Sequence, residues 1–417
     1  MSQADVLNLP LATGPDIVAS YIEEPLLLFG SGGVHLDPRA GIAGFGPYSL
    51  GLSTHPATVR VGLVGAAEHI ETARLWLERA AEGITGDKTN PSFPGFAEDR
   101  GFFSTLKFDD RWDAQISQTE MATVLGVRGQ RDRFEAAVEL YTEKIRLVAE
   151  RDQPPDYLIL TESDEFVQRC GVADFFDKDV GAVHRDFRRA IKAAAMKFRV
   201  PTQLLRQRTM EGRDPTAPAK IAWNYCTGLY YKAGGFPWVP RGLEPGTCFI
   251  GISFFRPLGS RSTLQTSLVQ AFNEYGDSLI LRGHEFEWDP DREASKSPHL
   301  SEDQAGRLID LALDRYEREN GTPARRVVVQ KSSQYWPQER EGFVGRLSER
   351  VQRFDLLALD TRQSNVRLIT TTKYPPLRGT RFKIGDLDYL YTTGFIPALR
   401  EFHGVHVPSP VQISDHV

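Results

Sequence analysis

The chain has 417 residues, a formal net charge of −5, and ordinary shares of hydrophobic (41%) and charged (25%) residues. Two or three domains with cores of their own are possible at this length, and the composition is that of a globular protein. No apolar run approaches the roughly 18 residues of a transmembrane helix, and the N-terminus lacks the pattern of a secretion signal. Three cysteines without a CxxC pair give no zinc signature and fit a reducing compartment. We therefore expect a cytoplasmic protein that does not associate with membranes.

The N-terminal passage from Leu26 to Leu50 is rich in glycine but contains the apolar run Leu26-Leu27-Leu28-Phe29. Two interpretations stay open. The run is either a docking surface for another protein or a buried strand between turns.

The following elements predict an α/β layer with a parallel sheet, because strands and helices alternate along the chain. We expect strands at 59–64 and 157–160 and helices at 67–81 and 132–150. Gly62 and Gly65 stand where a dinucleotide-binding turn would lie, but they lack the G-x-G-x-x-G spacing. We interpret them as a tight turn; a small-molecule-binding α/β enzyme is the alternative that they leave.

A basic segment follows. Between His184 and Lys220, ten Lys or Arg residues face three acidic ones, a local charge of +7 in an acidic chain. Such a patch is typical of a phosphate-bearing partner, and a solvated helix face with counter-ions is the other interpretation.

Within this segment, four polar residues could converge on one phosphate. Arg188 and Lys192 are four apart, so a helix projects both from one face. Gln203 follows after Val200-Pro201 restarts the chain as an extended segment, and Lys232 closes a second helix before Gly234-Gly235. A terminal phosphate needs several donors at once, which these side chains supply. Spacing alone also allows Arg188 and Lys192 to be solvent-facing charges, with Gln203 a turn residue and Lys232 a partner of the helix dipole.

The second half begins where prolines and glycines cluster between 237 and 245, which predicts domains at 1–240 and 241–417. Here we expect strands at 249–255, 278–281 and 326–330, and helices at 263–275 and 301–320. Ser301 is a candidate N-cap and Gly321 a candidate C-terminal glycine of the last helix.

The junction between the halves resembles that between the MID and PIWI domains of Argonaute proteins. The resemblance rests on a helix that ends in Lys232-Ala233-Gly234-Gly235, a Pro237-Trp238 corner and the strand Cys248–Phe255. It implies a Rossmann-like MID domain followed by an RNase H-like PIWI domain. In nucleolytic Argonautes this strand reads Gly-Ile-Asp, and the Asp holds catalytic metal. The matching residue here is Ser253.

The resemblance assigns the 5′-phosphate of a guide strand to Arg188, Lys192, Gln203 and Lys232. The first of these positions is usually aromatic or His, so Arg188 departs from the pattern, and His184 is a possible substitute. Some bacterial and archaeal members also bind a divalent cation here through the Gln and the C-terminal carboxylate. The resemblance therefore implies Mg²⁺ held by Gln203 and Val417.

The catalytic site of a PIWI domain needs two metals held by about four acidic or His side chains. The second invariant Asp corresponds to Ser332, so the resemblance implies no cleavage activity. We interpret the acids Glu285, Glu287 and Asp289 as a solvated turn. An active nuclease with an unorthodox site is the alternative. Lys373 and Arg378 are candidate contacts to the guide or target backbone, or exposed loop cations.

The similarity extends over nearly the whole chain, and the segments 24–30 and 37–41 resemble the start of short prokaryotic Argonautes, which consist of MID and PIWI alone. In that group the chain binds a guide, expected to be RNA and possibly DNA, and recognises complementary single-stranded invader DNA. A separate APAZ-domain protein then acts as the effector, through a TIR, sirtuin-like or nuclease domain. The resemblance thus implies a sensing subunit of antiviral defence in a heterodimer.

Overall fold

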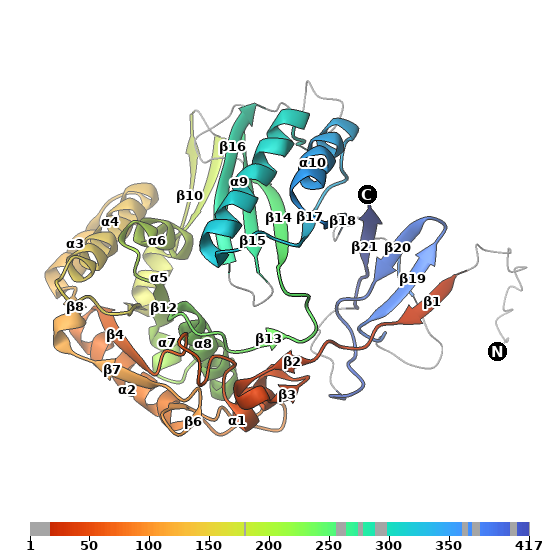
Figure 1. The fold of residues 1–417 in the computed structure, drawn as a ribbon. Coiled ribbons are helices and arrows are strands. Elements are labelled where there is room, and N and C mark those ends of the chain that lie inside the picture. Colours follow the sequence, from red (N-terminus) through yellow and green to blue (C-terminus); the bar gives the residue numbers. More distant parts are fainter. Residues whose placement is uncertain are drawn as a thin grey trace, which may run out of the picture. The chain divides into compact units, whose positions relative to one another are not determined.

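The structure is a computed structural model that describes residues 17–178, 181–255, 264–273, 278–287, 298–360, 366–368, 376–400 and 407–416 (Figure 1). The polypeptide forms two compact units that meet in the chain between Arg241 and Gly242. We call Leu26–Arg241 the central unit, and the described residues before Leu26 and after Gly242 the flanking unit.

A parallel sheet forms the middle of the central unit. Its strand order is β12-β9-β4-β7, and the short β8 also pairs with β4. The strands are β4 (Thr58–Gly65), β7 (Thr105–Phe108), β8 (Ala114–Gln115), β9 (Tyr157–Glu162) and β12 (Thr202–Arg206). All six residues of β9 are buried, as expected for a parallel strand covered on both faces.

Helices cover both faces of this sheet (Figure 1). Tyr157 and Ile159 belong to one hydrophobic core with α2 (Ala67–Glu82), α7 (Gln207–Met210) and α8 (Pro218–Lys232). Leu158 and Leu160 belong to a second core with α3 (Gln118–Gly126), α4 (Gln130–Ala149), α5 (Asp164–Cys170) and α6 (Phe187–Ala195). Successive strand residues thus alternate between two cores, because side chains on a strand alternate between its faces.

Smaller elements complete the central unit. The passage Leu26–Leu50 contains β2 (Leu27–Leu28), β3 (Val34–His35) and α1 (Pro38–Phe45), and β2 pairs with β3 and with β13 (Val239–Pro240). Phe29 is 1% exposed and joins the core, whereas Leu27 and Leu28 of β2 are half-buried and Leu26 is 38% exposed, so the run forms a strand that is only partly buried. The docking surface stays a prediction. The remaining pieces are β5 (Phe96–Ala97), β6 (Arg100–Gly101), and the hairpin of β10 (Val172–Asp177) and β11 (Gly181–Asp186). Three short 3-10 turns lie at Gly30–Gly32, Asp110–Trp112 and Met196–Phe198.

The predicted tight turn at Gly62 and Gly65 is wrong. Both glycines lie inside β4, where a Cβ on Gly62 would come within 2.3 Å of the Trp112 carbonyl oxygen. A Cβ on Gly65 would meet Thr161 Oγ1 at 1.8 Å. Glycine is needed here for close packing within the sheet, which removes the basis of the dinucleotide-site alternative.

The flanking unit has a nine-stranded mixed sheet in the order β1-β19-β20-β21-β18-β17-β14-β15-β16. Its central strands β14 (Thr247–Phe255), β17 (Arg326–Lys331) and β18 (Arg353–Asp360) are parallel. The antiparallel strands are β1 (Val18–Tyr21), β15 (Leu264–Phe272), β16 (Ser278–Glu287), β19 (Thr380–Ile384), β20 (Leu387–Leu390) and β21 (Val411–Asp415).

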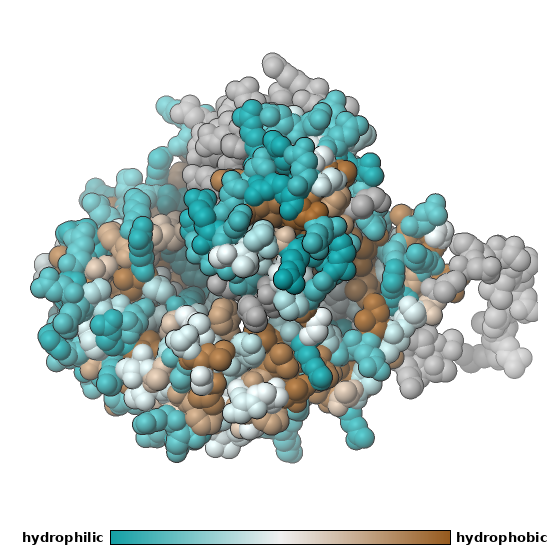
Figure 2. Space-filling view, viewed as in Figure 1, coloured by the Kyte–Doolittle hydropathy of each residue, from teal (hydrophilic) through white to brown (hydrophobic). Residues whose placement is uncertain are grey.

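Helices α9 (Glu302–Asn320) and α10 (Pro337–Arg350) pack over the parallel strands of this unit (Figure 1). Ser301 caps α9 in a capping box with Gln304, and Gly321 ends it in a left-handed conformation with φ 72°, as predicted. The outward faces of both helices carry hydrophilic side chains, teal in Figure 2, above an apolar contact with the sheet. This is the amphipathic arrangement of a helix on a sheet.

Three predictions about the flanking unit are wrong. The segment predicted as a helix at 263–275 contains strand β15, and the predicted turn at Glu285 and Glu287 is part of strand β16; Asp289 lies outside the described residues. The predicted 1–240 domain also takes in residues of the other unit, because β1 pairs with β19. Backbone pairing decides all three: β15 and β16 pair with neighbouring strands of the sheet, and β1 pairs with the distant β19.

The three cysteines are free thiols and buried. Within the part of the chain that the structure describes, no helix combines the length and the apolar character needed to cross a membrane.

Candidate nucleic-acid interface

Helix α6 presents Arg188 and Lys192 on its outer face. The Asp186 side chain caps the helix by accepting a hydrogen bond from the Arg189 backbone N–H at 3.0 Å. Phe187 and Ile191 point into the core, at 1% and 0% exposure. The helical period therefore places Arg188 and Lys192 together on the opposite side, as the sequence predicts.

Gln203 and Lys232 come from two further elements. Gln203 is the second residue of β12, the edge strand of the sheet, and Lys232 is the last residue of α8. The chain leaves α8 through Gly234, which has φ 97°, and Gly235, where a Cβ would approach the Tyr230 ring to 2.3 Å. The backbone conformation at Gly234 and the close packing at Gly235 therefore both require glycine, and together the two residues end the helix at Lys232.

The three cations lie close enough to change one another's proton affinity. Loss of solvation, with the charges of Lys192 and Arg188, lowers the pKa of Lys232 to about 8. Loss of solvation and the charge of Arg188 also lower the pKa of Lys192. Lys232 is exposed as a residue, but its ammonium group turns back to donate to the Thr202 carbonyl oxygen at 3.0 Å. We name Arg188, Lys192, Lys232 and Gln203 the cation cluster.

Ion pairs account for part of the basic segment. Four of its ten cations have carboxylate partners in the structure: Arg185 with Glu135, Arg206 with Glu162, Arg208 with Asp214, and Arg213 with Asp164 and Glu211. Among the described residues, neither Lys192 nor Lys232 has a carboxylate within ion-pair distance. The solvated-face interpretation therefore fits the paired arginines, and the cation cluster is distinct from them.

Tyr157 is a residue of this site that the sequence analysis missed. It is the first residue of β9, is 0% exposed, and donates from its hydroxyl to Gln203 Oε1 at 2.6 Å. Lys232 Nζ lies 3.3 Å from the same hydroxyl oxygen and 5.6 Å from the centre of the ring. The sequence signal is a tyrosine at the start of a buried strand, next to Leu158-Ile159-Leu160, since a buried tyrosine hydroxyl requires a polar partner.

The remaining candidate residues lie elsewhere. His184 belongs to β11, not to a helical turn before Arg188, and its Nδ1 lies 2.7 Å from Asp174 Oδ1. Arg378 in the flanking unit pairs with Glu24 at 2.8 Å. A role of either in nucleic-acid binding stays a prediction. Lys373 and Val417 lie outside the described residues.

Ser253 and Ser332 stand side by side in the flanking unit. Ile252 on β14 pairs with Lys331 on β17, and the next residue of each segment is the serine. Both serines are exposed, whereas Ile252 and Lys331 are buried on the other face. The two positions that resemble the catalytic Asp positions therefore share one exposed face at the carboxyl ends of parallel strands.

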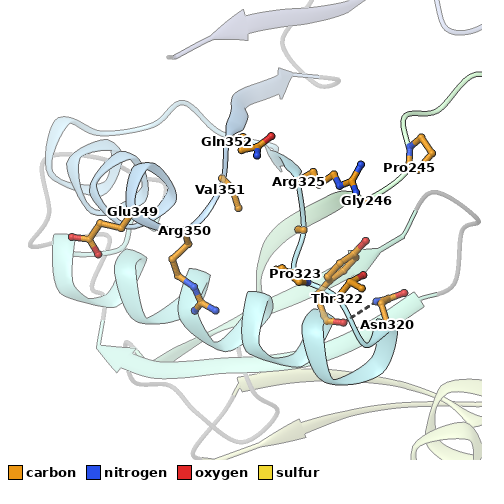
Figure 3. Close-up of a pocket in the computed structure, with 12 residues that line it drawn as sticks. Pro245, Gly246, Asn320, Thr322, Pro323, Arg325, Glu349, Arg350, Val351 and Gln352 are labelled. Atoms are coloured by element: carbon orange, nitrogen blue, oxygen red, sulfur yellow. Dashed lines mark hydrogen bonds between the residues drawn. The ribbon is translucent and has the colours of Figure 1, made fainter.

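A cavity of about 790 Å³ lies at the opposite, amino ends of β14, β17 and β18. Figure 3 shows Gly246, Arg325 and Gln352 on its sheet side and Arg350 between the helices. Arg350 is engaged with Asp310 and Asp314 of α9, at 3.2 and 2.7 Å. Ligand sites of parallel sheets lie at the carboxyl ends of the strands, so we assign no function to this cavity.

Solved structures with a similar fold are Argonautes. Clostridium butyricum Argonaute, bound to a guide DNA and a 19-mer target DNA, matches 96% of this chain with a TM-score of 0.64 and 15% identity. A. aeolicus Argonaute matches 95% with a TM-score of 0.56 and 15% identity. Marinitoga piezophila Argonaute, in complex with a 5′-OH guide RNA, matches 96% with a TM-score of 0.56 and 11% identity.

These likenesses concern the fold. They confirm the predicted class, an α/β Rossmann-like MID domain with an RNase H-like PIWI domain. No family model matches the sequence, and no curated protein matches it either. The chain spans about half the length of its structural neighbours, because the matches cover 47%, 47% and 51% of those proteins.

Proposed function

We propose that this chain binds a guide strand, RNA or DNA, and holds the 5′-phosphate of the guide in the cation cluster. The observation that carries the proposal is the convergence of Arg188, Lys192 and Lys232, where loss of solvation and the neighbouring positive charges together lower the pKa values of both lysines. A phosphate carries up to two negative charges and accepts several hydrogen bonds at once. It would relieve the mutual repulsion of these cations and use their donors.

The fold supports this role, since structural neighbours have been solved with guide and target strands. It does not by itself favour a phosphate, because the Marinitoga protein was solved with a 5′-OH guide RNA. The preference for a phosphate rests on the cation cluster of this chain.

The proposal includes that the chain does not cleave the target strand. Serine hydroxyls at 253 and 332 lack the charge with which carboxylates hold a metal pair. The serines at these two positions favour a binding protein over a nuclease with an unorthodox site.

The enzymatic response to target recognition would then come from a partner protein. We propose that pairing of the guide with complementary single-stranded invader DNA activates an APAZ-domain effector protein of the TIR, sirtuin-like or nuclease type. The support is the resemblance to short prokaryotic Argonautes and the lack of catalytic carboxylates at Ser253 and Ser332. The proposed setting is cytoplasmic antiviral defence.

Binding of matched strands tests the central claim. One RNA sequence with a 5′-phosphate and with a 5′-hydroxyl is titrated against the purified chain, and the same pair is made as DNA. We expect tighter binding of the phosphorylated strand in at least one of the two chemistries. Equal affinities for the 5′-phosphate strand and the 5′-hydroxyl strand, in both RNA and DNA, would contradict the assignment of the 5′-phosphate to the cation cluster.

A further inference from the structure

The hydrogen bond between Tyr157 and Gln203 fixes which end of the Gln203 amide is free. Lys232 has donors only, so the contact of its ammonium with the Tyr157 hydroxyl uses the phenolic oxygen as acceptor. The phenolic proton then goes to Gln203 Oε1, at 2.6 Å. Burial raises the pKa of Tyr157, so the hydroxyl keeps this proton at every relevant pH. Gln203 is left with its NH₂ group as the free end.

Every side chain of the cation cluster therefore offers donors. Arg188, Lys192 and Lys232 have no acceptor atoms in their side chains, and Gln203 Oε1 is turned toward Tyr157 and accepts its proton with one of its two lone pairs. Half-buried Lys192 and the desolvated ammonium of Lys232 also concentrate positive charge in a medium less polar than water. Such a site suits an oxyanion.

A magnesium ion fits these residues poorly. Mg²⁺ requires about six oxygen ligands in near-octahedral geometry. Gln203 Oε1, one of the two expected ligands, already accepts the Tyr157 proton, so a metal would have to share this oxygen with a hydrogen bond. Val417, the other expected ligand, lies outside the described residues. Three neighbouring positive charges would repel a divalent cation before a phosphate arrives.

We propose that the cation cluster holds a terminal phosphate directly through N–H donors, without a divalent cation, and that Tyr157 is the positioning residue that keeps Gln203 a donor. The inference rests on the proposed function, since it concerns the same site. Tyr157 acts through Gln203 and Lys232, because its hydroxyl is occupied by both.

Chelation provides the first test. The affinities of 5′-phosphate and 5′-hydroxyl RNA are measured in Mg²⁺ and in EDTA, with monovalent salt adjusted to equal ionic strength. We expect the phosphorylated strand to bind about tenfold tighter or more than the hydroxyl strand, because it forms charge-assisted hydrogen bonds. The ratio of these two affinities should agree within about twofold between the Mg²⁺ buffer and the EDTA buffer. A ratio above one only in Mg²⁺ would overturn this inference and leave the proposed function standing. A ratio of one in both buffers, found for the RNA pair and for the same pair made as DNA, would overturn the proposed function itself.

A hydroxyl deletion provides the second test. Tyr157→Phe keeps the buried ring and should reduce the phosphate-to-hydroxyl ratio by about threefold to tenfold. The matched control is Tyr141→Phe, because Tyr141 is also buried and its hydroxyl donates to the Thr161 carbonyl oxygen at 2.6 Å, in the other core. The control should keep the wild-type ratio. If Tyr157→Phe keeps the wild-type phosphate-to-hydroxyl ratio, or if the ratio falls equally in both variants, Tyr157 is not a positioning residue.

Discussion

Lys331 and Glu339 form an ion pair in which both side chains are 0% exposed. Glu339 is the third residue of α10 and also accepts from the backbone N–H groups of Leu300 and Trp336, at 3.2 and 3.4 Å. The pair thus ties the end of β17, next to Ser332, to the first turn of α10. A buried carboxylate with this many donors stays charged only while the donors remain.

Lys331→Met should therefore lower the free energy of unfolding by about 3–5 kcal/mol, because it removes the buried cation and leaves the Glu339 carboxylate with His299 and two backbone N–H groups as partners. The double variant Lys331→Met/Glu339→Leu should be less destabilised than the sum of the single variants. Urea denaturation measures both. Lys383→Met is the control, since the Lys383 side chain on β19 is 58% exposed. An unfolding free energy of Lys331→Met equal to that of the control would contradict the prediction.

Lys192→Ala should weaken binding of a 5′-phosphorylated guide by about 1–3 kcal/mol, the usual effect of losing a charge-assisted hydrogen bond. The affinity for the 5′-hydroxyl form of the same strand should change much less. Lys197→Ala is the matched control, because Lys197 is an exposed lysine of the same basic segment in the turn after α6. If both alanine variants lose affinity for the two ends equally, Lys192 contributes only general electrostatic attraction.

Guide affinity should depend on pH through Lys232. The pKa of Lys232 is lowered to about 8 in the free protein, and a bound phosphate dianion would raise it. Below pH 8 the ammonium is charged in both states, so the affinity is constant until the phosphate itself takes up a proton near pH 6. Above pH 8 binding must take up a proton, and the affinity falls by up to about tenfold per pH unit.

The variant Lys232→Arg separates this effect from other titrations, because a guanidinium stays charged over the same range. We expect a flat profile of phosphate preference between pH 7 and about 9.5 for this variant. The same decline in Lys232→Arg as in the wild type would show that another group titrates.

Much of the cation cluster could be predicted because its parts follow local rules. The four-residue spacing of Arg188 and Lys192 specifies one helix face, and the glycines after Lys232 specify where α8 ends. Tyr157 could not be placed in the same way. Its contact with Gln203 depends on which strand lies beside β9, and the pairing of Gln203 with Ile159 is set by packing of the two cores.

The failures in the flanking unit have the same origin. Leu264, Leu268 and Phe272 recur at helical spacing, yet β15 pairs along its length with β14 and β16. A short apolar run is compatible with either structure, and neighbouring strands decide. The pairing of β1 with β19 joins segments more than 350 residues apart, which no local pattern reports.

The guide-loaded chain should leave complementary DNA intact in Mg²⁺ or Mn²⁺, since Ser253 and Ser332 supply no carboxylate to their shared exposed face. Gel analysis of a labelled target checks this. The double variant Ser253→Ala/Ser332→Ala distinguishes intrinsic cleavage from contamination. Guide-directed products that appear with the wild type and vanish with the double variant would establish an unorthodox nuclease.

Finally, binding of guide and target should change the enzymatic activity of a second protein. Binding produces an outcome only when a state favoured by the duplex changes the activity of another catalytic element. Co-expression with the product of the adjacent gene should give a stable heterodimer whose enzymatic activity rises only with guide and complementary target. Lys192→Ala should preserve the heterodimer but require more guide for activation, by the same factor as its loss of affinity, whereas Lys197→Ala should respond like the wild type. Protection of cells from invading plasmids by this chain with the adjacent gene deleted would refute the need for a partner.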